Sequence, residues 1–158
     1  MRLFQKVSYA QYAKDVGGDA DLHSEYEAIK LPARATSGSA GYDFFSPCDI
    51  SLSPGESIKI PTGIRVSLDP DTFLMCVPRS GLGFKHRVGM DNTLGIIDFD
   101  YAYSDNEGHI HCKLHNGGDH DVFIPKRSAY MQGIILPYLL TDDDNSTGVR
   151  NGGFGSTG

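Results

Sequence analysis

The eight C-terminal residues, Asn151 to Gly158, read NGGFGSTG and combine glycines with one aromatic and two hydroxyl side chains. Glycines allow backbone N–H groups to converge on an anion, and Ser156 and Thr157 add hydroxyl donors. Arg150, just upstream, offers a planar fork for phosphate oxygens, and the ring of Phe154 offers a face on which a base can stack. A glycine-rich terminus is more often a disordered end, so the segment indicates a nucleotide site only if the rest of the chain supplies the other parts.

A second segment with phosphate-binding chemistry is PRSGLG, from Pro78 to Gly83. It follows an apolar run and presents Arg79 and Ser80 beside the flexible Gly81, as a phosphate-binding turn does. An ordinary surface turn is the alternative, because the hexapeptide alone is only moderately specific.

Two carboxylates, Asp98 and Asp100, flank Phe99 in the run NTLGIIDFDYAYSDNEGHI. If this run is a strand, alternation places both carboxylates on one face and Ile97, Phe99 and Tyr101 on the other. Such a carboxylate can act as a general base, and an exposed acidic strand face is the alternative. Periodicity does not decide which aspartate is catalytic.

The elements that must position these residues are mostly short β-strands. Only the start of the chain has a helical pattern, in which Ser8 and Gln11 fit a capping box for a helix over residues 9–16 that ends at two glycines. From about Ile29 onward, β-rich runs alternate with turn residues, which predicts an all-β sandwich or barrel. The expected strands are 41–45, 57–60, 64–68, 73–77, 109–114, 122–124 and 130–140, with polar linkers at 19–26 and 142–147.

With 158 residues, a formal charge of −6 and a pI near 5.4, the chain is expected to form one soluble domain. Its acidity argues against a nucleic-acid groove, so a phosphate ligand is expected to be a small metabolite. Cys48, Cys76 and Cys112 are far apart and lack metal-ligand spacing, which predicts free thiols in a reducing compartment. Without a signal-peptide pattern or a long apolar run, we expect a cytoplasmic protein with no nucleic-acid or membrane partner.

Three histidines, His109, His111 and His115, alternate along one expected strand. Such a face could bind a metal ion, but no carboxylate or thiol stands at a supporting spacing. Surface strand positions are therefore the favoured interpretation, and no protein-bound metal is expected.

The chemically suggestive segments belong to an ordered series: LPARATSGSAGYDFF, PRSGLGFK, GIIDFDY, YMQGII and GGFGSTG. The series resembles the five motifs of the trimeric deoxyuridine triphosphatase (dUTPase) family, and five ordered matches are far more specific than any one. The resemblance covers about residues 29–158, and the run KVSYAQYAKD is similar to the extension of phage and Gram-positive members. It implies a helical extension and linker at 1–28, a distorted jelly-roll core at 29–141, a linker and glycine-rich lid at 142–158, and a homotrimer.

The resemblance implies hydrolysis of dUTP to dUMP and pyrophosphate, which limits uracil incorporation into DNA and supplies dUMP. Asp98 matches the catalytic aspartate, which activates a water molecule for in-line attack on the α-phosphorus. Mg²⁺ is bound mainly through the triphosphate. Tyr101 matches the residue whose ring packs beneath the deoxyribose and excludes a 2′-hydroxyl. The uracil-reading hairpin corresponds to residues 92–98, with Asn92, Gly95 and Ile97 on the substrate.

The remaining substrate contacts of the family fall on three of the motifs. The matching residues are Arg79, Ser80 and Gly81 of the second motif, Gln132 of the fourth, and Arg150, Gly155, Ser156 and Thr157 of the fifth, with Phe154 stacking on uracil. Each site is implied to lie between subunits, with the fifth motif closing over it from a neighbour. Asp43 matches the aspartate of the first motif, near the metal or the interface, and an ordinary turn aspartate is the alternative.

Two motifs depart from the family's pattern. Ala129 stands where the fourth motif usually has an arginine, so that role is lost or passes to Lys126 or Arg127. Arg150 and Phe154 are one residue closer together than usual, which puts the reach of Arg150 in question.

The run AYSDNEG at 102–108 makes the hairpin after Tyr101 longer than usual. A solvated loop is the default interpretation, with a pocket rim or a partner contact as alternatives. Some phage members are thought to regulate a protein partner, so a regulatory dUTPase-fold protein is one alternative function.

A dCTP deaminase-like enzyme is the other alternative, because it shares the fold. Its chemistry requires a glutamate three residues before the asparagine that ends the hairpin's second strand. Lys113 stands at that position before Asn116, which argues against deamination.

Deleting residues 151–158 should abolish most catalysis without unfolding the protein. The deletion removes the stacking ring, two hydroxyl donors and the glycine cradle, but no residue expected in the core. Turnover of dUTP should fall by orders of magnitude, since positioning dominates phosphoryl transfer. Phe154→Ala should reproduce part of the defect, about 1–3 kcal/mol of stacking.

Pyrophosphate release, sedimentation and thermal melting check this expectation. A truncated protein with normal turnover would show that the segment is only a chain end.

Overall fold

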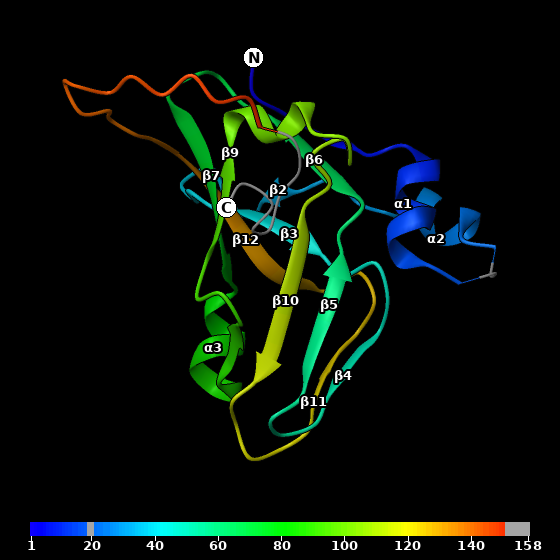
Figure 1. Cartoon of the computed structure of the whole chain (residues 1–158). Coiled ribbons are helices and arrows are strands. Elements are labelled where there is room, and N and C mark those ends of the chain that lie inside the picture. The colour runs from blue at the N-terminus through cyan, green and yellow to red at the C-terminus, as the bar shows by residue number, and fades with distance from the viewer. Residues whose placement is uncertain (19–20, 151–158) are drawn as a thin grey trace.

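Short β-strands follow one another along the chain between Ala33 and Pro137, and helices lie between some of them. The computed structural model describes residues 1–18 and 21–150 (Figure 1). The strands are β1 (Leu3–Lys6), β2 (Ala33–Arg34), β3 (Tyr42–Phe45), β4 (Ile50–Leu52), β5 (Ser57–Pro61), β6 (Ile64–Ser67), β7 (Thr72–Pro78), β8 (Val88–Met90), β9 (Gly95–Asp98), β10 (His111–Asn116), β11 (Val122–Ile124) and β12 (Ala129–Pro137). The helices are α1 (Tyr9–Val16), α2 (His23–Glu27), α3 (Ser80–His86) and the 3₁₀ helix η1 (Phe99–Tyr103).

The strands form an antiparallel β-sandwich. The largest sheet has the order β2-β3-β12-β7-β9, and a three-stranded sheet has the order β5-β10-β8, with β10 and β5 in front of β12 in Figure 1. Both sheets contribute side chains to one core, including Leu74 and Met131 from the larger sheet and Ile60 and Leu114 from the smaller one. The expectation of an all-β sandwich is confirmed, because alternating apolar residues bury one face of each sheet.

The cysteines are free thiols, as expected. Cys76 and Cys112 lie in the core, where burial raises the pKa of Cys76 to about 12. None of the helices in the described ranges has the length and apolar character needed to span a bilayer.

Three local expectations were wrong. The polar run 19–26 was expected to be a linker, yet α2 begins at His23. The PRSGLG turn opens helix α3 despite its glycines, because Leu82 packs against the core and compensates for poor helix propensity. The strand that carries Asp98 ends there, and η1 follows in place of a continued strand.

Helix α1 begins where the sequence predicts, but an insertion loop completes its cap. The backbone N–H of Gln11 donates to Ser8 Oγ at 3.1 Å, which is half of a capping box. The other half comes from Glu107, whose carboxylate accepts hydrogen bonds from the Ser8 backbone N–H at 2.7 Å and from Ser8 Oγ at 2.6 Å. The 102–108 loop is therefore a docking surface for α1, and the default interpretation as a purely solvated loop was wrong.

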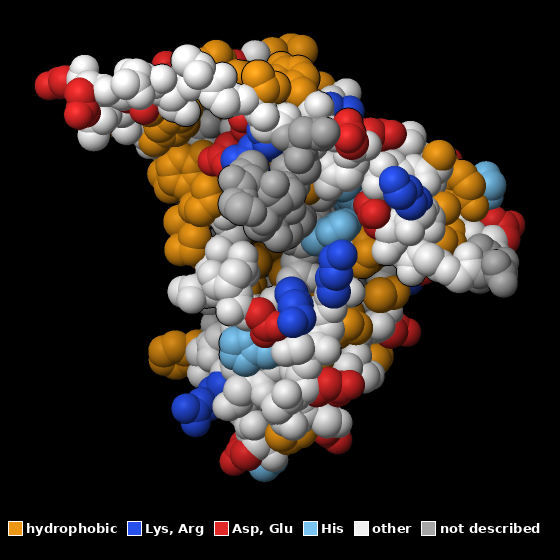
Figure 2. All heavy atoms as spheres, viewed as in Figure 1, with side chains coloured by type: hydrophobic (Ala, Val, Ile, Leu, Met, Phe, Trp, Pro, Cys, Tyr) orange, Lys and Arg blue, Asp and Glu red, His pale blue; other side chains and the backbone are white. Residues whose placement is uncertain are grey.

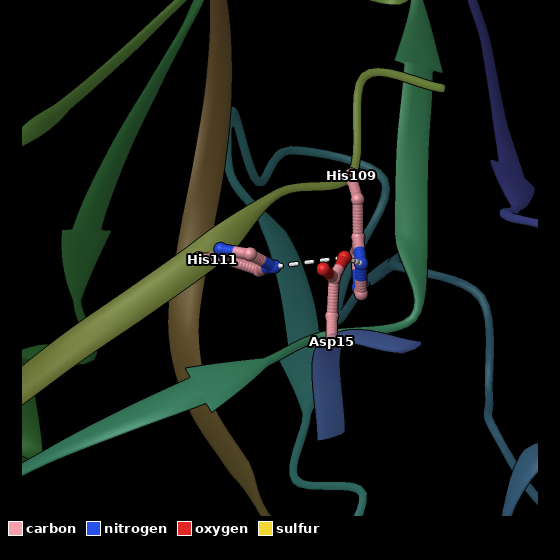
Figure 3. A group of neighbouring side chains, drawn as sticks. All are labelled: Asp15, His109 and His111. Atoms are coloured by element: carbon pink, nitrogen blue, oxygen red, sulfur yellow. Dashed lines mark hydrogen bonds and ion pairs between the residues drawn. The ribbon is translucent and has the colours of Figure 1, made fainter. Parts of the chain in front are cut away.

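The far end of α1 docks on β10 through Asp15. The Oδ2 atom of Asp15 lies 2.5 Å from His109 Nδ1 and 3.3 Å from His111 Nε2 (Figure 3). His109 is fully buried and His111 nearly so, which makes the surface interpretation wrong for both. Their carboxylate partner lies 94 residues from His109 in the chain, so no sequence spacing could reveal it. His115 is half-exposed beside Asp91, as a surface position should be.

Both buried imidazoles resist protonation. Burial first, and then the electrostatic effect of His109 and Lys59, lower the pKa of His111 to about 4, while Asp15 opposes the shift. Burial also lowers the pKa of His109, again against the hydrogen bond and charge of Asp15. For Asp15, burial opposes ionisation, but hydrogen bonds from Gln11 and His109 outweigh it and hold the pKa of this carboxyl below its usual range.

Mild acid should therefore destabilise the folded protein. The ordinary pKa of a histidine is 6.5, whereas folded His111 takes up its proton only near 4. Between these values the unfolded chain binds more protons, so stability is lost as the pH falls. We expect His111 alone to lower the free energy of unfolding by about 2 kcal/mol between about pH 7.5 and pH 5, measured by urea titration at fixed protein concentration.

The His111→Gln variant should show a flatter pH profile, whereas Lys14→Ala, at an exposed position on α1, should keep the wild-type profile. An unchanged slope in His111→Gln would contradict this assignment.

Candidate active site

A cavity of about 230 Å³ opens beside β9 and the start of β10. It brings together many of the residues expected to bind substrate, namely Asn92, Gly95, Ile97, Asp98, Tyr101 and Arg150. His111 also lines this cavity and was not among the expected site residues. The 92–98 hairpin thus forms part of the wall of a pocket that both polar and apolar side chains line.

Strand β9 forms this wall because it pairs closely with β7. Gly95 stands opposite Cys76 and Asp98 stands opposite Phe73. A Cβ atom on residue 95 would lie 3.2 Å from Cys76 Cβ, tighter than an ordinary contact, so glycine allows this approach. Asp98 then ends the strand with its side chain about half exposed at the mouth of the cavity.

Arg150 brings the two expected carboxylates together. Its Nη2 donates to Asp98 Oδ2, and its Nε donates to Asp100 Oδ1 at 2.8 Å. The strand alternation expected for this pair was wrong, since η1 begins at Phe99, but both carboxylates still reach one guanidinium. Arg150 itself therefore reaches the cavity, while Phe154, Gly155, Ser156 and Thr157 lie outside the described residues.

The ring of Tyr101 is fixed in the wall of the cavity. It is 3% exposed, and its hydroxyl donates to the His109 carbonyl at 2.8 Å. The side-chain amide of Asn106 donates to the same hydroxyl at 2.7 Å. Burial raises the pKa of Tyr101, so the hydroxyl stays protonated as a donor. Asn106 belongs to the 102–108 loop, which therefore contacts the pocket wall as well as α1. This contact agrees with the pocket-rim alternative for the loop.

A second polar group gathers residues of the first, second and fourth motifs. Arg79 Nε lies 3.3 Å from Asp43 Oδ1, and Gln132 pairs in register with Asp43. A Cβ atom on Gly41 would lie 2.4 Å from Gln132 Oε1, so the glycine leaves room for this amide. Arg79, Ser80 and Gly81 are exposed at the start of α3, where their donors can meet an anion.

The two groups stand at opposite ends of β7. Phe73 is opposite Asp98, whereas Val77 is opposite Gln132. Four residues of strand separate these positions by roughly 13 Å, and cross-strand partners share a face of the sheet. Between them lies the half-exposed Ile96, opposite Met75. Figure 2 shows hydrophobic side chains along the left edge of the molecule, where Figure 1 places β7.

The departures from the motif pattern also have definite positions. Ala129 begins β12 opposite Phe45, next to an irregularity in the strand pairing. Lys126 and Arg127 are exposed in the preceding turn.

Lys113, at the position where a deaminase requires glutamate, is an exposed residue whose Nζ lies 2.7 Å from Asp91 Oδ2. Its place on the surface argues further against deamination.

Comparison with known proteins gives a consistent result along almost the whole chain. The family model described as dUTPase matches residues 27–158. A deoxyuridine 5′-triphosphate nucleotidohydrolase of Lactococcus lactis subsp. lactis is 38% identical over 133 residues, covering 82% of this chain and 89% of that protein. The enzyme of the same name from Aeromonas salmonicida is 36% identical over 148 residues, covering 89% and 92%.

Solved structures share the fold. A dUTPase from Streptococcus mutans has a TM-score of 0.67 at 28% identity, covering 88% of this chain and 98% of that one. A variant of the Staphylococcus bacteriophage 80alpha dUTPase with dUpNHpp has a TM-score of 0.68 at 17% identity, covering 96% and 99%. These likenesses confirm the distorted jelly-roll with a short N-terminal helix that the sequence predicts. With the family model matched over nearly all of the β-sandwich and its motif residues gathered around two polar groups, the chain belongs to the dUTPase family.

Proposed function

We propose that this protein hydrolyses dUTP to dUMP and pyrophosphate. Relatives named deoxyuridine 5′-triphosphate nucleotidohydrolase are 35–38% identical over most of the chain. The observation that carries the proposal is the cavity beside β9, where Asp98 stands at the mouth of a pocket lined by Asn92 and Tyr101. A carboxylate beside a pocket with this lining supports the assignment of Asp98 as the base.

In this proposal Asp98 deprotonates the water that attacks the α-phosphorus. The carboxylate accepts a hydrogen bond from Arg150 Nη2. Phosphate oxygens offer the guanidinium the same bidentate geometry, so an arriving triphosphate draws Arg150 away and releases Asp98 as a base. The arginine then stabilises charge on the phosphates, which is where positioning and electrostatics contribute most to phosphoryl transfer.

The selectivity for deoxyribose follows from the fixed ring of Tyr101. Its hydroxyl is held by Asn106 and by the His109 carbonyl, so the ring has little freedom to move aside for a 2′-hydroxyl. A rigid wall rejects a larger ligand more strongly than a mobile one does. Backbone groups of the 92–98 hairpin, with Gly95 and Ile97, read the uracil in this scheme.

We assign Mg²⁺ to the triphosphate. Among the described residues, the group close enough to supply three metal ligands is Asp15, His109 and His111, which does not match the all-oxygen sites that Mg²⁺ prefers. The residues around the cavity therefore fit an ion that arrives with the phosphates and neutralises part of their charge. Their own task is to bind and align the chain of phosphates.

The proposed active form is a homotrimer with shared sites. The Asp98 group and the Arg79–Gln132 group lie at opposite ends of β7, so within one chain the base is far from the donors of Arg79 and Gln132. Ile96, opposite Met75, forms an apolar surface between the two groups. A second copy packed on this surface would bury it and would bring the Asp98 group of one chain to the Arg79–Gln132 group of the other.

We divide the chain into an N-terminal extension (1–28), a core (29–141) and a C-terminal lid region (142–158). In the proposed mechanism the glycine-rich segment 151–158 closes over each site. We place the enzyme in the cytoplasm, in keeping with its free thiols.

Replacing Asp98 with Asn should abolish turnover and preserve binding. The amide keeps the size of the side chain but cannot take the proton, so kcat should fall by about 10²–10⁴-fold. The affinity for dUTP, measured by calorimetry with the inactive variant, should stay within about threefold of the wild-type affinity for a non-hydrolysable analogue.

Asp105→Asn, the same change at an exposed residue of the 102–108 loop, is the matched control and should keep full activity. An active Asp98→Asn together with an inactive Asp100→Asn would move the base to Asp100.

Mixing two inactive variants should restore activity if the sites are shared. Asp98→Asn lacks the base and Arg79→Ala lacks a phosphate donor, and each homotrimer should be inactive. After subunit exchange at equal concentrations, about one quarter of the sites should combine an intact Asp98 with an intact Arg79 from different chains. Pyrophosphate release should therefore recover to about that fraction of the wild-type rate.

Sedimentation should show a trimer for each variant and for the mixture. A mixture that remains inactive after proven exchange, or an active monomer, would contradict shared sites.

A further inference from the structure

The carboxylate of Asp15 is the meeting point of three donors from two elements. Its Oδ2 accepts a hydrogen bond from Gln11 Nε2 at 2.7 Å within α1, and lies 2.5 Å from His109 Nδ1 and 3.3 Å from His111 Nε2 (Figure 3). Asp15 precedes the residues that the dUTPase model matches, 27–158. The cluster therefore joins an extension outside the family match to the strand that lines the nucleotide cavity.

The hydrogen bonds fix the tautomer of His109. The backbone N–H of Gly63 donates to His109 Nε2 at 2.8 Å, so this nitrogen presents its lone pair. In the neutral ring the proton must then be on Nδ1, from which it is donated to Asp15. Burial keeps the ring neutral by lowering its pKa. His109 is thus held between a donor on one side and an acceptor on the other.

This tautomer argues against a metal site, although the residue types would suit one. A metal ion on Nδ1 would require a proton on Nε2, which would then face the N–H of Gly63. Two ligands of a tetrahedral zinc ion, each at about 2.0–2.1 Å from the metal, would also stand about 3.3 Å apart. The 2.5 Å between His109 Nδ1 and Asp15 Oδ2 is a hydrogen-bond distance instead.

The same two histidines contribute to the cavity wall in different ways. His111 lines it directly, and the hydroxyl of Tyr101 donates to the backbone carbonyl of His109 at 2.8 Å. Loss of the acceptor at Asp15 would leave a buried N–H of His109 unpaired, and the ring would have to move to satisfy it. Any such movement shifts the carbonyl that holds Tyr101 and the neighbouring side chain of His111.

We infer that Asp15 is a positioning residue for the nucleotide pocket, which acts by accepting hydrogen bonds from His109 and His111 and so fixes the walls formed by Tyr101 and His111. This inference rests on the proposed function, because it takes the cavity to be the nucleotide site. It assigns to the N-terminal extension a role in substrate affinity, in addition to its role in packing.

The test compares Asp15→Ala, Asp15→Asn and Ser8→Ala in the full-length protein. Asp15→Ala should raise the KM for dUTP and the Kd for dUMP about tenfold, with kcat within about threefold, because misplaced walls weaken binding before chemistry. In Asp15→Asn the amide oxygen still accepts from His109, so KM should return to within about threefold of wild type. Imidazole ¹⁵N spectra should show a fixed Nδ1–H tautomer of His109 in the wild type that is lost in Asp15→Ala.

Ser8→Ala is the matched control, because at the other end of α1 it removes the hydrogen bond from Ser8 Oγ to Glu107 and the acceptor for the Gln11 N–H, while the backbone bond of Ser8 to Glu107 and both histidines are left in place. It should lower the melting temperature comparably and leave KM unchanged. Equal KM and Kd values in Asp15→Ala and Ser8→Ala would overturn the inference, as would an Asp15→Asn variant that is as impaired as Asp15→Ala. Stabilisation of the wild type, but not of Asp15→Ala, by added Zn²⁺ would overturn it in favour of a metal site.

The two proposals can fail separately. A wild-type protein that does not hydrolyse dUTP would refute the proposed function, and the role of Asp15 would then be decided by the dUMP affinities alone. A wild-type protein that hydrolyses dUTP, with an unaltered KM in Asp15→Ala, would refute only the positioning role.

Discussion

The pairing of β7 with β9 on one side and β12 on the other determines where the candidate site residues stand. Asp98 and Gln132 are fixed at the two ends of β7 because each is the register partner of a β7 residue. Two glycines make these close pairings possible. A Cβ atom on Gly133 would lie 2.8 Å from Leu74 Cδ1 and 3.0 Å from Phe44 Cε2, and one on Gly95 would lie 3.2 Å from Cys76 Cβ. The positions of Asp98 and Gln132 therefore depend on neighbouring residues, Gly95 and Gly133, that have no functional group but leave space for the side chains packed against them.

Charge is the second constraint, because an acidic protein must attract a highly charged anion. The net charge of −6 works against binding, so cationic groups must be concentrated where the phosphates lie. Arg150 and Arg79 are each paired with a carboxylate. Each carboxylate holds its arginine in position and balances its charge. A phosphate group can replace the carboxylate, because both offer the guanidinium similar hydrogen-bond geometry.

The N-terminal extension and the 102–108 loop contact different parts of the cavity wall. Glu107 accepts hydrogen bonds from Ser8 at the start of α1, Asn106 donates to the hydroxyl of Tyr101, and Asp15 contacts His109 and His111 at the start of β10. The contacts of Glu107 and Asp15 join segments at least 94 residues apart, and those of Asn106 and Asp15 are partly buried. Segments that do not themselves touch substrate can in this way affect how rigidly the walls of a pocket are held.

The sequence by itself determined the β-sandwich, helix α1 and the series of motif segments, because alternation of apolar residues and helix capping are local properties of the chain. It did not predict α3, where packing of Leu82 offsets two glycines, or the end of β9 at Asp98. The sequence did predict many of the site residues. Those that line the cavity are Asn92, Gly95, Ile97, Asp98, Tyr101 and Arg150. Only the tertiary structure separated the two polar groups along β7 and brought Asp15 to His109 and His111. A local pattern records whether a residue is suited to burial or exposure, but the partner that a buried polar group meets is decided by the packing of the whole chain.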